Sequence, residues 1–270
     1  ISRRPDEFNC LTNFHMELHA NPPNSKLTVY PLRDPISLIF YSFDDANNMF
    51  RHLNFASGIL IFNNTNIDMN LIQRLSHTLN KHIEIFDDEL KMITKLVTLV
   101  ELFDPDILSG YEVNSMSWGY IVERLRDVFG INIMLDLSRG SFKSNGKFGD
   151  RWGYTHTSNI EISGRHMLNV WRPLRSELSL TSYSLENVTY HLLHKSLPRY
   201  LNYRLSEWLK EGTFSSIFAV LSYYINRIDI VLKIINVQEL ITRNVEHSRL
   251  IGIEFNSNFY RGSQYKVESI

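Results

Sequence analysis

Carboxylates, imidazoles and thiols are the side chains that could bind a metal ion or transfer a proton in this chain. Asp104 and Asp106 form an acid pair, but Pro105 between them predicts a helix end and a turn. A single cysteine, Cys10, excludes an internal disulfide and a cysteine zinc site and fits a reducing compartment. Four histidines lack the H-E-x-x-H spacing of metal-binding helices: His166, His191, His194 and His247. The residues alone therefore predict no metal centre.

A short segment near residue 200 combines basic and aromatic side chains: Arg199, Tyr200, Tyr203 and Arg204. Aromatic rings stack on unpaired bases, and arginine adds cation contacts, so this segment is a candidate for binding single-stranded DNA. The whole chain has 28 basic and 29 acidic residues and a formal net charge of -1. Because binding a polyanion over a whole surface normally leaves a basic excess, any contact with nucleic acid is expected to be local.

The elements that must position these side chains follow from short apolar runs. Four runs are typical of strands: 11–19, 36–43, 58–62 and 83–86. Helices are predicted over 89–104, after a cap at Asp87 or Asp88, and over 120–129, 185–194 and 214–242. In the helix over 120–129 we expect Arg124 to face outward and Val128 inward. Strands in succession followed by helices indicate an α/β domain, with the strands around Glu17, Phe40 and Leu60 as neighbours in one mixed sheet.

Residues 103–120 read Phe-Asp-Pro-Asp-Ile-Leu-Ser-Gly-Tyr-Glu-Val-Asn-Ser-Met-Ser-Trp-Gly-Tyr. This stretch resembles the second exonuclease motif of family B DNA polymerases, D-P-D-I-I-x-G-Y-N-x-x-x-F-D-x-P-Y. The pair Glu112-Val113 and the run at 117–120 resemble one translesion member of the family in particular. Where a proofreading enzyme carries a metal-binding Asp, this chain has Ser117.

The resemblance extends to the first and third exonuclease motifs. The first motif, D-x-E, matches residues 15–17, so that His15 stands in place of the Asp and Glu17 is kept. Aligning residues 248–252 with the family's Ala-Arg-x-x-Gly places Tyr223 and Arg227 on the Tyr-x-x-x-Asp of the third motif. Family enzymes hold two divalent metals with four carboxylates, and a guanidinium cannot ligate. The resemblance thus implies vestigial positions without metal and without catalysis. We expect Glu17, Ser117 and Arg227 to converge in one cleft, where Arg227 fills the metal space and pairs with Glu17.

The same resemblance implies a ribonuclease H-like 3′–5′ exonuclease-type fold, with a mixed sheet flanked by helices. Residues 1–248 would be an inactive exonuclease-like domain with an N-terminal lead-in strand, and residues 249–270 would begin the connection into the polymerase palm. The chain looks like a piece of a longer polymerase, and Mg²⁺ and an iron–sulfur cluster would belong only to other parts of that parent. Expected partners are primer-template DNA and other polymerase subunits, in the nucleus. No apolar run reaches the ~18–20 residues of a membrane helix.

The function implied is a structural module that supports the palm, the thumb and the primer-template DNA of a polymerase for lesion bypass, with neither polymerase nor exonuclease activity of its own. One alternative is an active 3′–5′ exonuclease that uses Glu17 with Asp229 or Glu112. Asp229 lies two residues after Arg227, and a two-residue slip on a helix turns the side chain by about 200°, so we do not expect it to replace the missing acid. The other alternative is a protein-interaction domain that binds through the helix over 214–242.

Overall fold

One mixed sheet organises the part of the chain that the computed structural model describes, which is residues 11–22, 28–44, 55–62, 69–140, 160, 162–261 and 263–268. Within these ranges six strands pair in the order β4-β3-β2-β1-β5-β6. Their bounds are β1 Asn13–Ala20, β2 Ile36–Asp44, β3 Ser57–Phe62, β4 His82–Phe86, β5 Ile107–Gly110 and β6 His166–Asn169. β1 and β3 are antiparallel to β2, whereas the pairs β3–β4, β1–β5 and β5–β6 are parallel. The predicted neighbours are confirmed, because Glu17 pairs with Phe40 and Ile39 pairs with Leu60.

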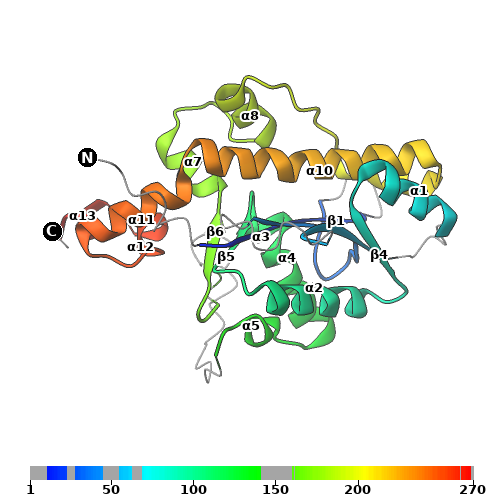
Figure 1. Ribbon diagram of the computed structural model, residues 1–270, viewed down its shortest axis with the longest axis horizontal. Coiled ribbons are helices and arrows are strands. Elements are labelled where there is room, and N and C mark those ends of the chain that lie inside the picture. The colour runs from blue at the N-terminus through cyan, green and yellow to red at the C-terminus, as the bar shows by residue number, and fades with distance from the viewer. Residues whose placement is uncertain are drawn as a thin grey trace.

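Helices cover both faces of this sheet (Figure 1). Below it in the view lie α2 (Glu89–Phe103), α4 (Trp118–Arg124), the π-helix η1 (Leu125–Phe129) and α5 (Ile133–Asp136). Above it runs the long helix α10 (Phe214–Val237), with α8 (Leu185–Leu193) above α10 and α7 (Trp171–Glu177) at its left end in the view. The other described helices are α1 (Met69–Leu79), α3 (Val113–Met116), α9 (Asn202–Glu211), α11 (Leu240–Ile251), α12 (Ser257–Tyr260) and α13 (Ser263–Glu268). The α/β prediction is therefore confirmed, and among the described residues no helix is long and apolar enough to cross a membrane.

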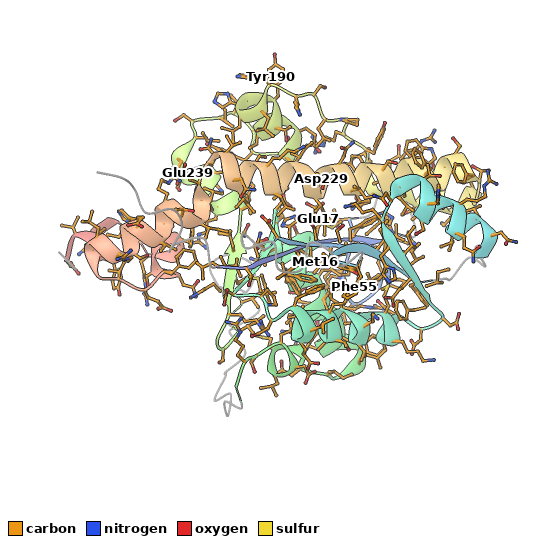
Figure 2. The ribbon with its side chains drawn as sticks, in the orientation of Figure 1. Met16, Glu17, Phe55, Tyr190, Asp229 and Glu239 are labelled. Atoms are coloured by element: carbon orange, nitrogen blue, oxygen red, sulfur yellow. The ribbon has the colours of Figure 1, made fainter. Side chains whose placement is uncertain are left out.

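Strand β1 is buried on both faces, and its two faces differ in chemistry. Its even-numbered residues are apolar and join the core formed with α2 and α4, which contains Phe14, Met16, Leu18 and Ala20. Its odd-numbered residues are polar and point to the side of α10: Asn13, His15, Glu17 and His19. Figure 2 shows Met16 and Glu17 on opposite sides of the sheet. Because side chains alternate along a strand, this pattern places a row of buried polar groups beneath the long helix.

Acidic residues fix the start of β5, which carries the second exonuclease-like motif toward β1. Asp104 ends α2 in the left-handed region with φ 43°, and its carboxylate accepts from Arg139 at 2.7 Å and pairs with Arg165 at 2.9 Å. Asp106 accepts from the backbone N–H and the hydroxyl of Thr12, each at 3.0 Å. Both acids are therefore structural, as the proline between them suggested.

In the helical segment over residues 120–129, the buried side chains differ from those that were predicted. Arg124 was expected outside, but it is buried and its guanidinium donates to both oxygens of Glu89 at 3.1 and 2.9 Å. Val128 was expected inside, but 43% of it is exposed. Both errors have a physical reason. A distant acid compensates the charge of Arg124, and the π-helix at 125–129 changes the angular step on which the helical pattern depends.

The helix expected over 214–242 is two helices. It ends at Val237, and Glu239, with φ 47°, separates α10 from α11. The domain boundary predicted after residue 248 falls within α11, and residues Ser263–Glu268 near the C-terminus are helical. The lead-in residues 1–10 lie outside the described residues.

Candidate functional site

The motif positions Glu17, Ser117 and Arg227 converge on one cavity of about 230 Å³, as the motif alignment predicted. They come from β1, from the start of α4 and from the middle of α10, so that residues far apart in sequence meet where the long helix crosses the sheet. The other residues around the cavity are Leu18, Tyr111, Glu112, Met116, Ser184, Leu185, Glu186, Arg199, Tyr200, Asn202, Tyr223 and Tyr224. The alignment of the third motif is thereby supported, because a wrong register would have put Arg227 on another face.

Arg227 binds Glu17 directly. Its Nε donates to Glu17 Oε2 at 2.8 Å, and 18% of the Arg227 side chain and 7% of the Glu17 side chain are exposed. Burial alone would lower the pKa of Arg227, but the charge of Glu17, the nearby Tyr223 and the hydrogen bond to Glu17 outweigh burial and raise it. The guanidinium is therefore a permanent cation against the one carboxylate that the exonuclease motifs retain.

Glu186 is a second carboxylate on the same guanidinium, and the sequence interpretation missed it. It lies in the first turn of α8, and its Oε1 accepts from Arg227 Nη1 at 3.2 Å. The same Nη1 lies 3.3 Å from the hydroxyl of Tyr223, one helical turn before Arg227. No motif marks Glu186, and 41 residues separate it from Arg227, so that spacing offered no signal.

Ser117 is buried and contributes a hydrogen bond to the backbone. Its Oγ donates to the carbonyl oxygen of Met16 at 2.6 Å, and this bond ties the start of α4 to β1. Gly110, at the end of β5, permits the approach, because a Cβ there would lie 2.5 Å from Ser117 Oγ. The hydroxyl is thus positioned by the sheet, but it offers no negative charge to a cation.

His15 is fully buried, on the same face of β1 as Glu17. Its Nδ1 is joined to Ser109 Oγ by a hydrogen bond of 3.0 Å. Burial, helped by the charge of Arg227, lowers the pKa of His15 from 6.5 to about 3. His19, two residues beyond Glu17, contacts Tyr224 Oη at 2.9 Å and Ser206 Oγ at 3.0 Å, and burial lowers its pKa to about 4. Both imidazoles are therefore neutral around pH 7.

The two acids considered for an active exonuclease lie in different places. Glu112 lines the same cavity as Glu17. Asp229 lines a small hollow with Tyr41, Gly58 and Lys81, beside β2 and β3. This separation follows from the two-residue offset from Arg227 along α10, and it confirms that a slip in register does not bring Asp229 to Glu17.

The four residues considered for DNA contact are split by the structure. Arg199 and Tyr200 line the cavity, and the ring of Tyr200 meets Trp208 and Tyr223 edge-on at 5.0 and 5.2 Å. Arg204 is exposed, pairs with Glu207 at 3.0 Å and lies 5.6 Å from the ring of Trp208. Tyr203 and Arg204 are not among the residues that line the cavity.

Two divalent metal ions do not fit this set of donors. A two-metal site needs several oxygen anions around both ions, whereas Glu17 holds a guanidinium and Ser117 donates to a carbonyl. Among the described residues there is no group of three or more His, Cys, Asp or Glu side chains that could hold a metal. The arrangement can instead form a buried network of ion pairs and hydrogen bonds.

Comparison with known proteins places this geometry in a family. Residues 2–188 match the family described as DNA polymerase family B, exonuclease domain. The chain is 38% identical to the DNA polymerase zeta catalytic subunit of Saccharomyces cerevisiae, in an alignment of 262 positions that covers 96% of the chain. It is 33% identical to that of Schizosaccharomyces pombe, in an alignment of 271 positions that covers 99% of the chain. It is 35% identical over 187 residues, 68% of its length, to the DNA polymerase zeta catalytic subunit of Homo sapiens. The chain spans 17%, 18% and 6% of these relatives.

Proposed function

The chain belongs to the exonuclease domains of family B DNA polymerases, and on that premise we propose that it is a degenerate, catalytically inactive member of this group. The observation that carries the proposal is the ion pair between Arg227 and Glu17. A guanidinium keeps its proton and cannot ligate a metal, so the remaining motif carboxylate is occupied by a cation of the protein itself. Without two metals the attacking water and the leaving 3′ oxygen lack their stabilisation.

The role that we infer is structural: the domain supports the palm, the thumb and the primer-template DNA of its parent. The parent would be a DNA-directed DNA polymerase in lesion bypass, in the nucleus, together with other polymerase subunits, by similarity to the DNA polymerase zeta catalytic subunits. Loss of proofreading suits that task, because an active exonuclease would remove a distorted primer end before extension. Mg²⁺ and an iron–sulfur cluster would serve other parts of the parent.

Metal titration tests the absence of the exonuclease centre. We expect millimolar Mn²⁺ to stay free in the presence of the unmodified chain, as measured by its electron paramagnetic resonance signal. The triple variant His15→Asp, Ser117→Asp and Arg227→Asp restores the motif acids and is expected to bind Mn²⁺ weakly, since residues that orient the ligands also tune affinity. Adding Glu17→Gln to the triple variant should remove this binding. Stoichiometric binding by the unmodified chain that Glu17→Gln abolishes would contradict the proposal.

Single-stranded DNA binding tests the support role and distinguishes the residues at the cavity from those outside it. We expect Tyr200→Ala to weaken binding of a labelled oligonucleotide by about 1–3 kcal/mol, because a base loses its stacking partner, and Arg199→Ala to weaken it in a salt-dependent way. Fluorescence anisotropy measures both effects. Tyr190→Ala is the matched control, because Tyr190 is 65% exposed on the outer side of α8 (Figure 2). An equal loss in Tyr190→Ala would argue against a DNA contact at the cavity.

A further inference from the structure

We propose that Arg227 is a built-in cation that takes the place of a metal in a carboxylate pair formed by Glu17 and Glu186. In this arrangement a protein side chain, rather than a metal ion, holds β1, α8 and α10 together. This inference rests on the proposed function, in which the cavity holds no metal. It adds Glu186, a residue that belongs to none of the exonuclease motifs.

The geometry places one cation between two acids from different elements. Nε of Arg227 contacts Glu17 on β1 at 2.8 Å, and its Nη1 contacts Glu186 on α8 at 3.2 Å. The planar guanidinium can donate in several fixed directions, so a single side chain from α10 reaches both carboxylates. Arg227 thereby joins α10 to two segments whose acids lie 210 and 41 residues before it in the sequence.

The carboxylates of Glu17 and Glu186 could be neutralised fully only by a cation with more than one positive charge. Glu17 and Glu186 are two carboxylates on the single guanidinium of Arg227. Around the same cavity Glu112 adds a third acid and Arg199 a second cation. A divalent ion would neutralise the two carboxylates completely. Arg227 therefore meets the need for positive charge only in part.

A free acceptor atom supports the same view. Glu17 is buried, with 5% of its surface exposed, and its Oε1 has no hydrogen-bond partner within the described residues. Glu17 lines the cavity, so that removal of the guanidinium would leave both of its oxygens for a cation, beside Glu186 and the hydroxyl of Tyr223. Carboxylate oxygens are ligands that Mg²⁺ and Mn²⁺ prefer. The chain thus contains a latent single-ion site that its own arginine occupies.

Thermal unfolding with and without Mn²⁺ tests this inference. The melting temperature of the unmodified chain should not respond to millimolar Mn²⁺, whereas that of Arg227→Ala should rise by about 5 °C, as expected for a ligand that binds only the folded state. The response should vanish in Arg227→Ala with Glu186→Gln. It should persist in Arg227→Ala with Glu112→Gln, because Glu112 lines the cavity but makes no hydrogen bond to the guanidinium among those of the described residues.

If Arg227→Ala folds too poorly for a melting experiment, its refolding with and without Mn²⁺ is measured instead. Recovery of folded chain in Mn²⁺, lost when Glu186 is also replaced by Gln, supports the inference, and no recovery overturns it. A response of Arg227→Ala that is independent of Glu186 overturns the inference while leaving the proposed function intact. Stabilisation of the unmodified chain by Mn²⁺ contradicts the proposed function itself.

Discussion

Replacing Arg227 by Ala is expected to lower the free energy of unfolding by about 3–5 kcal/mol, because it leaves a buried carboxylate without its counter-ion. Glu17 is 5% exposed and has Arg227 as its ion-pair partner. Glu186 loses the same partner. Urea unfolding of the purified chain, followed by circular dichroism, measures the change.

The control for Arg227 is Arg204, whose ion pair with Glu207 is about half exposed on both sides. Arg204→Ala should cost less than about 1 kcal/mol, since exposed ion pairs contribute little. Combining Arg227→Met with Glu17→Gln and Glu186→Gln should recover much of the lost stability, because no buried charge is then left unpaired. Equal effects of Arg227→Ala and Arg204→Ala would show that the buried network does not stabilise the fold.

Stability is expected to fall steeply as the pH drops from 6.5 toward 4, because two histidines are buried in the neutral form. Burial lowers the pKa of His15 to about 3 and that of His19 to about 4 from 6.5. Below pH 6.5 the unfolded chain binds protons at both positions while the folded chain does not. Each histidine therefore removes about 1.4 kcal/mol of stability per pH unit, until the pH reaches its folded-state pKa. Above pH 6.5 this contribution is fully present.

The pH dependence is measured by urea unfolding at a series of pH values. His15→Asn keeps a polar atom near Ser109 and removes the titrating group, so its slope between pH 6.5 and 4 should be shallower by about 1.4 kcal/mol per unit. His191→Asn, on the exposed side of α8, should leave the slope unchanged. Identical slopes for the unmodified chain and His15→Asn would mean that His15 is not held neutral by the fold.

Strands β1 to β4 could be predicted from the sequence because each is a short apolar run. The pairing of Glu17 with Arg227 could also be predicted, since the family motifs fix backbone positions even where the side chains have changed. Glu186 could not be predicted, because its partner is 41 residues away and no local pattern marks it. The same reason explains Arg124, which the helical pattern placed outside and which Glu89 holds inside from a distance of 35 residues.

Backbone irregularities account for the other errors. The π-helix after Arg124 and the left-handed Glu239 after α10 interrupt regular periodicity. Neither has a local signal such as a glycine or a proline at the interrupted position. For the DNA candidates, nearness in sequence was a poor guide, because Tyr200 precedes α9 and lines the cavity, whereas Tyr203 and Arg204 lie on the helix itself and do not line it.

Release of mononucleotides from a 3′-labelled single strand, in Mg²⁺ or Mn²⁺, is the most direct test of the claim that this domain has lost exonuclease chemistry. We predict no time-dependent release by the unmodified chain, because two-metal hydrolysis requires carboxylates that hold both ions and Glu17 is bound to Arg227. The substitution Glu17→Ala should therefore change nothing in the assay. Release by the unmodified chain that Glu17→Ala or Glu112→Ala abolishes would contradict the account and establish an active exonuclease that uses non-standard acids.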